Sequence, residues 1–494
     1  MKRLFLTTIL LLNTTLAATE AQVVGANAAT HRDHATHQDR ATQEVRHAPT
    51  AQSAAITTTA QDANTSQAVR VSPEGTDAAE PSVAASAKDG SVYVVWVEHG
   101  ANGAADVWLA RFAADGRRLG ATPTRVNLRA GGATAWRGDP PTVAVSPDGR
   151  SVYVGWMARD KSVASASPAD AASLQLSTSR DGGRTFAPPV KVNDELKPHA
   201  HGLHSLAVAA DGRVHVAWLD ERGVVPPPAA HADADAKGKH TGHHEEPNRQ
   251  VFTAYSADGG RTFSPNRLIA RDACPCCKTS LAAAPGGRVY VSWRQVLAGD
   301  FRHIAVAASA DGGQKFAAPV VVSDDRWMLN GCPVSGASLA VGGDGTLGVA
   351  WYTAGEAGAP GIYRTESRDG GQTFAARRAV VTGKAQGTPS LLAAAGDAEF
   401  IVWESRAGGA TRPASARIER GGESVSGTRD LAQGGELPSA TMSRDGRMFV
   451  AYVSKQGDRR AISLMRAGGS DAPTATTPDA SPTGRTKKPV RTMN

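Results

Sequence analysis

Short apolar strands separated by Asp-Gly turns recur along most of the chain. The clearest copies are PSVAASAKDGSVYVVW (81–96), PTVAVSPDGRSVYVGW (141–156) and HSLAVAADGRVHVAW (204–218), and four further copies end at Trp293, Trp351, Trp403 and Tyr452. Alternation of apolar and polar residues with a period of two is typical of β-strands that bury one side. The pattern therefore predicts seven antiparallel strand pairs, A and B, at the spacing of blade-sized repeats.

A second repeat is an eight-residue turn between further strand-like runs. It reads SRDGGRTF (179–186), SADGGRTF (256–263), SADGGQKF (309–316) and SRDGGQTF (367–374). The aspartate of such a turn accepts hydrogen bonds from backbone N–H groups a few residues on, and the Gly-Gly pair supplies positive φ angles. We expect each octet to join two antiparallel strands, C and D. The aspartates with this structural role are Asp181, Asp258, Asp311 and Asp369.

The octet closely resembles the Asp-box, or bacterial neuraminidase repeat, with its Ser-x-Asp-x-Gly-x-Thr-aromatic signature. Resemblance to this sialidase-like family implies an all-β fold, a β-propeller of four-stranded antiparallel blades. The A/B repeats give seven blades by count, and the alternative is six, the usual number in the neuraminidase family. The last unit lacks its fourth strand. We expect QAVRVS (67–72) to supply it, so that an N-terminal strand closes the ring and leaves no exposed sheet edge.

The segments outside the propeller differ sharply in composition. Residues 1–21 have a charged start, a short apolar run and then small residues, which predicts a secretory signal peptide. Residues 22–66 form a His-rich polar linker, residues 226–247 a His-rich insert, and residues 468–494 a polar tail, all expected to be disordered. The propeller is thus assigned to residues 67–467, and the protein is expected to be periplasmic or secreted.

The charge pattern narrows the range of partners. The formal net charge is +7, but lysine and arginine are scattered and form no basic stripe with interleaved aromatic residues. Nucleic acid is therefore excluded as a partner. No run after the signal peptide is long and apolar enough for a membrane span. We expect a monomer that binds a glycan or an envelope protein.

Propeller topology predicts where a ligand binds. The A–B and C–D turns, including the Asp-boxes, lie on one face, and the B–C and D–A connections lie on the other. The opposite face therefore carries the candidate ligand-binding residues. These are Asp220, Glu221, Arg222, Arg294, Tyr352, Glu404 and Arg406.

All the cysteines of the chain fall in D–A connections on that opposite face. They are Cys274, Cys276, Cys277 and Cys332, with His201 and His204 in the neighbouring unit. Thiolates and imidazoles suit copper(I) or zinc, which predicts a metal site. A disulfide between Cys332 and one of the other cysteines is the alternative in an oxidising compartment, and thiol exchange is a third interpretation.

The family resemblance also implies an exo-α-sialidase-type glycoside hydrolase. Such an enzyme needs clustered arginines, a carboxylic acid and a Tyr nucleophile paired with Glu. The Arg-Ile-Pro motif of those enzymes is absent, and Tyr352 directly follows Trp351 without an evident Glu partner. Our hypothesis is therefore an exported ligand- or metal-binding protein with no assigned catalytic residue, and the hydrolase is the alternative.

Overall fold

The computed structural model describes residues 68–159, 172–195, 199–224, 247–329, 333–394, 398–419 and 424–467. All of them belong to one compact unit, Asp62–Asn494. The expected signal peptide, N-terminal linker, C-terminal tail and almost all of the insert lie outside the described residues, as does Cys332.

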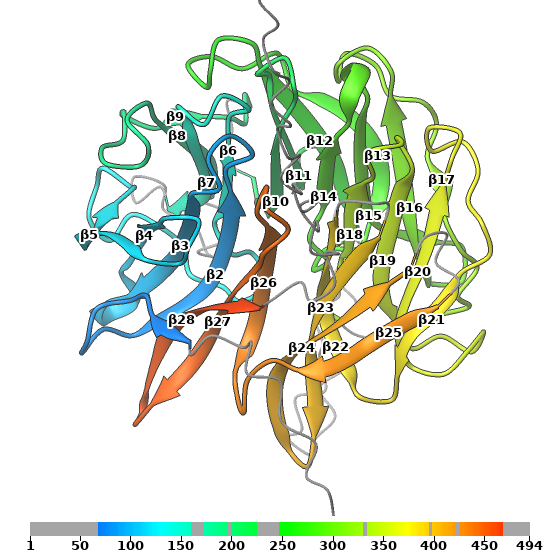
Figure 1. Ribbon diagram of the computed structural model, residues 1–494. Helices are drawn as coiled ribbons and strands as arrows, with labels where there is room; N and C mark the ends of the chain where they lie inside the picture. The colour runs from blue at the N-terminus through cyan, green and yellow to red at the C-terminus, as the bar shows by residue number, and fades with distance from the viewer. Residues whose placement is uncertain are drawn as a thin grey trace, which may run out of the picture. The chain divides into compact units, whose positions relative to one another are not determined.

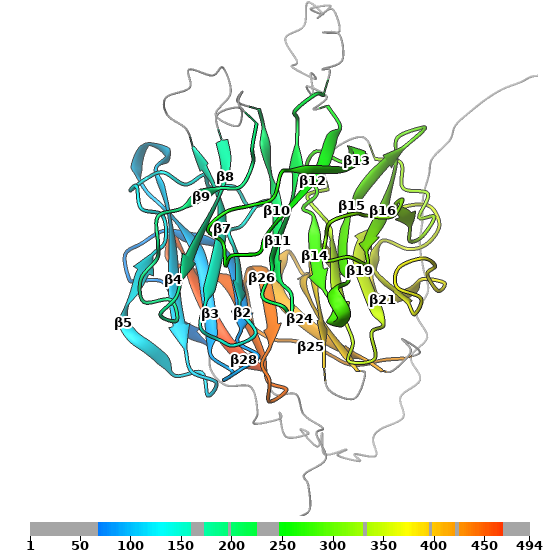
Figure 2. The ribbon, with the colours of Figure 1, turned by 90° about the horizontal axis from the view of Figure 1, so that it is seen from above.

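The described residues form antiparallel β-sheets with hardly any helix, which confirms the all-β prediction (Figures 1 and 2). Two short 3-10 helices, Ala101–Gly103 and Pro285–Gly287, lie between strands. The first sheet contains β2 (Ala78–Ala85), β3 (Val92–His99), β4 (Ala105–Phe112) and β5 (Arg118–Arg125). The second contains β6 (Thr142–Val145), β7 (Val152–Arg159), β8 (Ala172–Ser179) and β9 (Val190–Lys191).

The next two groups of strands are joined. They are β10 (His201–Val208), β11 (Val214–Asp220), β12 (Arg249–Ser256) and β13 (Arg267–Ala273), then β14 (Ser280–Ala283), β15 (Val289–Leu297), β16 (Phe301–Ser309) and β17 (Val320–Val321). One pairing, between Ala273 and Gln295, links the two groups into an eight-stranded sheet. The cysteine-containing connection lies beside this link.

Three further sheets follow in chain order. One contains β18 (Ala337–Val341), β19 (Leu347–Thr353), β20 (Gly361–Ser367) and β21 (Arg378–Thr382). Another contains β22 (Ala385–Ala393), β23 (Glu399–Ala407), β24 (Ala410–Ile418) and β25 (Val425–Asp430). The last contains β26 (Glu436–Met442), β27 (Met448–Gln456), β28 (Arg459–Ala467) and β1 (Val69–Arg70).

The N-terminal strand pairs with the last sheet, at the place that the repeat pattern predicts. Val69 faces Leu464 in the β1–β28 ladder, and the Val71 N–H donates to the Ile462 carbonyl at 2.7 Å. The two ends of the described chain are therefore held together within one sheet.

The first strands of neighbouring sheets pack against each other. β2 contacts β6, and the contacts continue through β10, β14, β18, β22 and β26 back to β2. These strands lie toward the middle of the view in Figure 1, whereas β5, β17 and β21 lie toward its margin. The layers between sheets are filled by valine, alanine and leucine with fully buried tryptophans, including Trp96, Trp218 and Trp351. The B-strand tryptophans are thus core residues rather than ligand platforms.

The Asp-boxes are tight turns between the third and fourth strands of four successive four-strand groups, two of which belong to the eight-stranded sheet, as predicted. In the second box the Asp258 carboxylate accepts from the Arg261 and Thr262 N–H groups, each at 3.0 Å, and from the Thr262 hydroxyl at 2.6 Å. The Ser256 hydroxyl also donates to Asp258, at 2.7 Å, and accepts from the Gly260 N–H. These bonds hold the pKa of Asp258 far below its usual value. The aspartates are therefore structural.

Several first strands begin with a β-bulge. The ladder register shifts beside Glu80, Leu203 and Leu437, whose φ angles are 53°, 58° and 51°. In β22 a glycine, Gly387, has φ 74° at the corresponding shift. Non-glycine residues at positive φ are costly, and bulges re-aim the side chains next to them. The bulges lie at the ends of the D–A connections, which is the end of the sheets that carries the cysteines.

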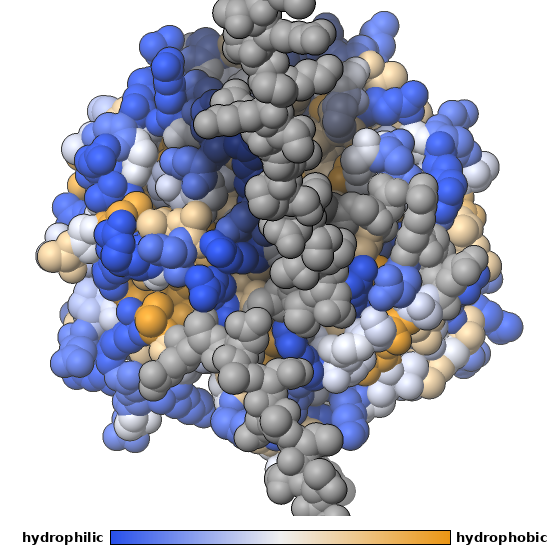
Figure 3. All heavy atoms as spheres, viewed as in Figure 1, coloured by the Kyte–Doolittle hydropathy of each residue, from blue (hydrophilic) through white to orange (hydrophobic). Residues whose placement is uncertain are grey.

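No helix among the described residues has the length and apolarity needed to cross a membrane. On the face shown in Figure 3, hydrophilic residues predominate and hydrophobic residues form small patches among them. The most exposed large apolar side chains of the described residues include Leu128, Trp136 and Met328.

Candidate thiol site

The cysteine group occupies the connection from β13 to β14. The Cys274 N–H donates to the Arg294 carbonyl at 2.8 Å, so the connection begins by extending the pairing with β15. The Cys277 N–H then reaches the Cys274 carbonyl at 3.4 Å, which turns the chain around Pro275. Because strands alternate in direction, a D–A connection lies at the end of the sheet opposite to the C–D turns. The described cysteines are therefore on the face opposite the Asp-boxes, as predicted.

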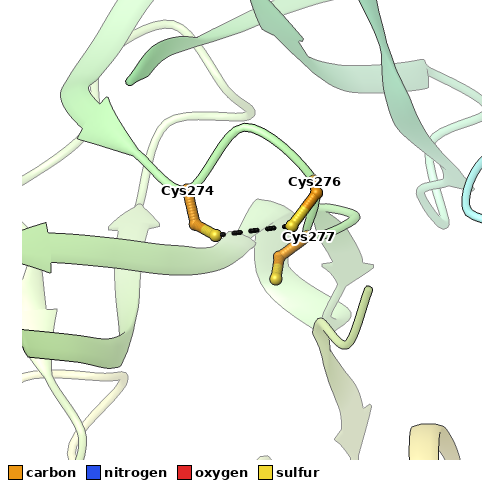
Figure 4. A group of neighbouring side chains, drawn as sticks. All are labelled: Cys274, Cys276 and Cys277. Carbon is orange, nitrogen blue, oxygen red and sulfur yellow. Dashed lines mark hydrogen bonds between the residues drawn. The ribbon is translucent and has the colours of Figure 1, made fainter. Parts of the chain in front are cut away.

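The three described sulfur atoms are close together and buried. All lie within 4.8 Å of one another, in a group that can hold a metal ion. Cys274, Cys276 and Cys277 are each at most 3% exposed and pack with Val296. The Cys274 and Cys276 sulfurs are 3.8 Å apart and point toward each other (Figure 4). Cys274 and Cys277 are free thiols, whereas Cys276 is not among the free thiols.

Positive charge surrounds this group. The Arg302 guanidinium donates to the Cys274 sulfur at 3.2 Å. A hydrogen bond from Cys277, aided by the charges of Arg302 and Arg294, lowers the pKa of Cys274 to about 6 against the effect of burial. Burial and the neighbouring Cys274 raise the pKa of Cys277 well above its usual value. These opposite shifts favour the anionic form of Cys274 over that of Cys277.

Arg294 is a buried cation without a carboxylate partner among the described residues. Its side chain is fully buried and donates to the carbonyls of Ser335 (3.1 and 3.0 Å), Arg302 (3.2 Å) and Tyr352 (2.9 Å). It also lies over the Trp327 ring, 4.7 Å from the centroid. The sequence places Arg294 on the ligand-binding face. In the structure its N–H groups donate to backbone carbonyls of the protein. Arg294 therefore influences the Cys274 thiol through its positive charge.

The sequence patterns did not single out Arg302 as a site residue. It faces Val296 across the β15–β16 ladder, and Arg294 faces Ile304 two residues along the same ladder. Pairing the two strands of this hairpin would have placed Arg302 at the same end of the sheet as Arg294 and the cysteines. Its Nε is buried and has no hydrogen-bond partner among the described residues.

His201 lies in a separate ion-pair network, so the proposed sharing of His201 with the cysteines is corrected. Its Nε2 is 3.3 Å from an Asp220 oxygen and 3.4 Å from a Glu195 oxygen. Burial opposes its protonation, but the neighbouring carboxylates of Asp220 and Glu195 raise the pKa of His201 to about 9. His201 also holds the pKa of Glu195 near 2, despite burial.

Arg222 completes this network. Its guanidinium contacts Asp220 at 2.7 Å, Glu195 at 2.9 Å and Asp194 at 2.7 Å, and lies over the Phe252 ring. His201, Glu195 and Asp220 also form a group whose ligand atoms lie within 4.8 Å of one another. The positive charges of His201 and Arg222 already neutralise the carboxylates of Glu195 and Asp220. We therefore interpret the network as an ion-pair contact between two sheets rather than as a metal site.

His204 lies near the start of β10 and is fully buried. Its Nδ1 is 2.9 Å from Asp139, which also accepts from the His204 N–H at 3.1 Å. The Lys278 amine donates to the Pro140 carbonyl at 3.1 Å, and burial lowers the pKa of Lys278 to about 8 against the charge of Asp139. His204 is therefore positioned by a carboxylate rather than by the thiols, and within the described part of the chain its Nε2 has no hydrogen-bond partner.

The remaining candidate residues do not converge on the cysteines. Glu221 pairs with Arg249 at 2.7 Å, and Arg406 is exposed. Glu404 is buried and accepts from the Leu437 N–H at 2.7 Å and from Gln386, so it holds a β-bulge. Tyr352 packs edge-on against Trp327. The structure thus brings together the described cysteines with Arg294 and Arg302, and gives Glu221 and Glu404 structural partners.

Comparison with known proteins shows the fold and not the activity. No protein-family model and no curated protein matches the sequence. A polysaccharide lyase of the PL25 family, an ulvan lyase, superposes with a TM-score of 0.51 at 12% identity over 80% of this chain and 94% of that chain.

Two other solved structures are less similar. A protein of unknown function from Dyadobacter fermentans has a TM-score of 0.46 at 15% identity, over 66% of this chain and 93% of that chain. The Hadza microbial sialidase Hz136 has a TM-score of 0.44 at 17% identity, over 67% of this chain and 63% of that chain. The chain is therefore similar in its β-sheet fold to the PL25 lyase.

Proposed function

We propose that this protein is an exported, seven-bladed β-propeller that binds copper(I) through the thiols at the β13–β14 connection. The observation that carries the proposal is the group of three buried cysteine sulfurs within 4.8 Å of one another. Soft thiolate ligands favour copper(I), and a protein site for it needs no water or carboxylate. The pairing of β1 with β28 and the contacts from β2 round to β26 support a closed ring of seven blades.

Copper(I) suits this ligand set better than zinc. Structural zinc is bound by four ligands in a tetrahedron. Here Cys274 and Cys277 are free thiols, while His201 and His204 are held by carboxylates elsewhere. Two thiolates are a sufficient set for copper(I), which accepts low coordination numbers. The proposed ligands are therefore Cys274 and Cys277, joined by Cys276 when the protein is fully reduced.

We further propose that Cys276 forms a disulfide with Cys332 in the oxidised protein. The chain has four cysteines, and two of the described ones are free thiols. A secretory signal peptide at residues 1–21 would deliver the chain to an oxidising compartment, where such a bond persists. The bond would tie the β13–β14 connection to the β17–β18 connection.

Copper(I) competition titration of the full chain tests the metal proposal. We expect the reduced protein to take about one equivalent of copper(I) from bicinchoninate with high affinity. Replacing Cys274 or Cys277 with serine should weaken this binding by about a hundredfold or more, because each supplies a thiolate. A variant with His240, His243 and His244 changed to asparagine is the control for the His-rich insert and should keep the tight site. Equal copper retention by the cysteine variants would contradict the proposal.

Glycan binding or cleavage is the second candidate function. It is favoured by the fold shared with the PL25 structure, which is described as bound to a glucuronic acid–sulfated rhamnose unit. That lyase superposes with a TM-score of 0.50 at 12% identity. Asp220, Arg222, Tyr352 and Arg406 lie at the same end of the sheets as the cysteines and are the residues to test. Release of methylumbelliferone from its sialic acid conjugate, lost in Arg406→Ala, whose side chain is exposed, would favour the hydrolase over the metal-binding protein.

A further inference from the structure

The connection from β5 to β6 exposes two large apolar side chains. Leu128 is 68% exposed and Trp136 is 43% exposed, so both are in contact with solvent. Tryptophan is mostly buried in folded proteins, and exposed apolar side chains that occur together mark surfaces for a partner. This is a D–A connection, so it lies on the face opposite the Asp-boxes.

Leu128 lies in a turn that is tied to the first sheet. The Asn127 side-chain amide donates to the Arg129 carbonyl and to the Asp106 carboxylate, each at 2.7 Å. Asp106, at the start of β4, also accepts from the Gly131 N–H at 2.8 Å. These bonds hold the backbone on both sides of Leu128, whereas the leucine side chain stays exposed.

Trp136 lies in a second turn, which is tied to the neighbouring sheet. The Asp139 N–H donates to the Trp136 carbonyl at 3.0 Å, and the Asp139 carboxylate accepts from the His204 N–H of β10 at 3.1 Å. Gly138 packs against the six-membered ring of the indole, since a Cβ there would lie 2.5 Å from a ring carbon. The ring is therefore held in place by glycine and by the anchored turn while it remains partly exposed.

Exposed arginines accompany both apolar side chains. Arg129 follows Leu128, Arg137 follows Trp136, and Arg125 ends β5; all three arginines are exposed. None of them forms an ion pair with a described residue. Residues 125–138 contain no aspartate or glutamate. The two turns thus present apolar side chains together with positive charge that the described residues do not neutralise.

We propose that these two turns attach the protein to a lipid surface with anionic headgroups. The headgroup region of a bilayer accepts the indole ring of tryptophan, and leucine enters the acyl boundary below it. Arginine is attracted to anionic lipid and binds its phosphates. A sugar ring stacked on the indole would leave Leu128 without a role. A lipid surface accounts for both apolar side chains and for the arginines.

Attachment of this kind is reversible. Only two large apolar side chains enter the bilayer, and a small apolar group needs added electrostatic attraction to hold a protein at a membrane. Binding should therefore require anionic lipid and weaken as salt rises, because salt screens exposed charges. The two turns contain none of the proposed copper ligands, so the attachment does not depend on copper.

Co-sedimentation with vesicles tests the attachment. The chain without its proposed signal peptide, residues 1–21, is mixed with vesicles of phosphatidylglycerol and phosphatidylcholine in equal parts, or of phosphatidylcholine alone. We expect binding to the anionic vesicles only, and a lower affinity at higher salt. Leu128→Ser and Trp136→Ser should each weaken binding by about fivefold or more, and Arg129→Gln by about fivefold.

Matched controls separate these turns from general surface effects. Leu268→Ser changes an exposed leucine of β13, and Arg150→Gln changes an exposed arginine of the β6–β7 turn. Both variants should bind the anionic vesicles like wild type. Trp136→Phe should keep most of the binding, because phenylalanine is also apolar, but it should lose the fluorescence quenching that brominated lipids cause in wild type.

Three results would overturn the lipid surface. One is equal binding to neutral and anionic vesicles, and another is wild-type binding by both Leu128→Ser and Trp136→Ser. The third is no vesicle binding at low salt together with binding of heparin that is lost in Trp136→Ser and kept in Leu128→Ser. That third result would assign the indole to an acidic glycan instead.

Discussion

Arg294 and Arg406 were both predicted to lie on the ligand-binding face, but they have different environments in the structure. Arg294 is fully buried and donates to three backbone carbonyls, whereas Arg406 is exposed. Buried acceptors that lose their donor pay the full cost of desolvation. Arg294 is therefore expected to contribute to the stability of the thiol site as well as to its electrostatics.

Replacing Arg294 with leucine should lower the free energy of unfolding by about 3 kcal/mol or more, because the carbonyls of Ser335 and Tyr352 lose their donor. Arg406→Ala should change it by less than about 0.5 kcal/mol, as is usual for exposed residues. Urea unfolding of the two variants measures the difference. Equal effects would show that the carbonyls are not held by Arg294.

The network of His201, Glu195 and Asp220 should give stability a distinct pH dependence. The folded-state pKa of His201 is raised from 6.5 to about 9, so its contribution is complete below pH 6.5 and is lost as the pH rises through 9. The acids have lowered pKa values, so their contribution is lost only as the pH falls below 4.5 toward 2. We expect His201→Gln to remove roughly 2–3 kcal/mol of the stability lost between neutral and alkaline pH. Parallel pH-dependent unfolding curves for wild type and variant would contradict this assignment.

At the level of residues, the sequence predicts which end of the sheets carries chemistry but not which residues meet. Asp220 and Arg222 are two positions apart in the chain, and their contact is local. Glu195 follows β9 of the second sheet, so nothing in the spacing shows that it joins them. The same holds for Arg302, whose partner Cys274 lies in a different hairpin. Contacts of this kind depend on how neighbouring sheets pack.

At the level of elements, the four Asp-boxes can be compared with one another, because the second and third differ at the threonine position. In the second box both the hydroxyl and the N–H of Thr262 donate to Asp258, at 2.6 and 3.0 Å. In the third box Lys315 replaces the threonine, so Asp311 accepts the Lys315 N–H at 2.9 Å and the Ser309 hydroxyl at 2.8 Å but no hydroxyl from position 315. The third turn therefore lacks the threonine hydroxyl bond, although the Gln314 side chain donates to the Asp311 carbonyl at 2.9 Å.

Lys315→Thr should therefore raise the free energy of unfolding by about 0.5–1 kcal/mol, by adding that hydrogen bond. The reverse change, Thr262→Lys, should lower it by a similar amount. Thermal unfolding of both variants against wild type is the measurement. A destabilised Lys315→Thr would mean that the lysine stabilises the third turn in another way.

The turns of the sheets were predictable, whereas the bulges were not. Glycine pairs and an aspartate at fixed spacing specify each Asp-box turn from local chemistry alone. The bulges place Glu80, Leu203 and Leu437 at positive φ, where sequence preference predicts glycine or asparagine. Tertiary contacts accompany them: the Leu203 carbonyl, for example, accepts from the hydroxyl of Thr279, in the β13–β14 connection, at 2.9 Å.

At the level of the whole molecule, the first and last described strands pair with each other. Arg460 binds Asp77 at 2.6 and 2.9 Å, and Ser72 accepts from the Ile462 N–H at 3.1 Å, both next to the β1–β28 ladder. The sequence predicted this pairing because the last unit has one strand too few. Because the units repeat, a unit with one strand too few can be recognised from the sequence, and the missing strand can be sought elsewhere in the chain.

Deleting residues up to Ser72 should lower the melting temperature by about 5 °C or more, because it removes β1 and exposes the edge of β28. Deleting residues 468–494, outside the assigned propeller, is the matched control and should shift it by less than about 1 °C. Calorimetry of both truncated chains makes the comparison. Similar shifts would count against closure by the N-terminal strand.

X-ray absorption at the copper edge of the copper(I)-loaded full chain tests the central claim most directly. Copper held at the β13–β14 connection should have sulfur neighbours only, and the Cys274→Ser and Cys277→Ser variants should lose that signal. A first shell of nitrogen or oxygen that persists in both variants would place the copper on histidines and contradict the thiol site.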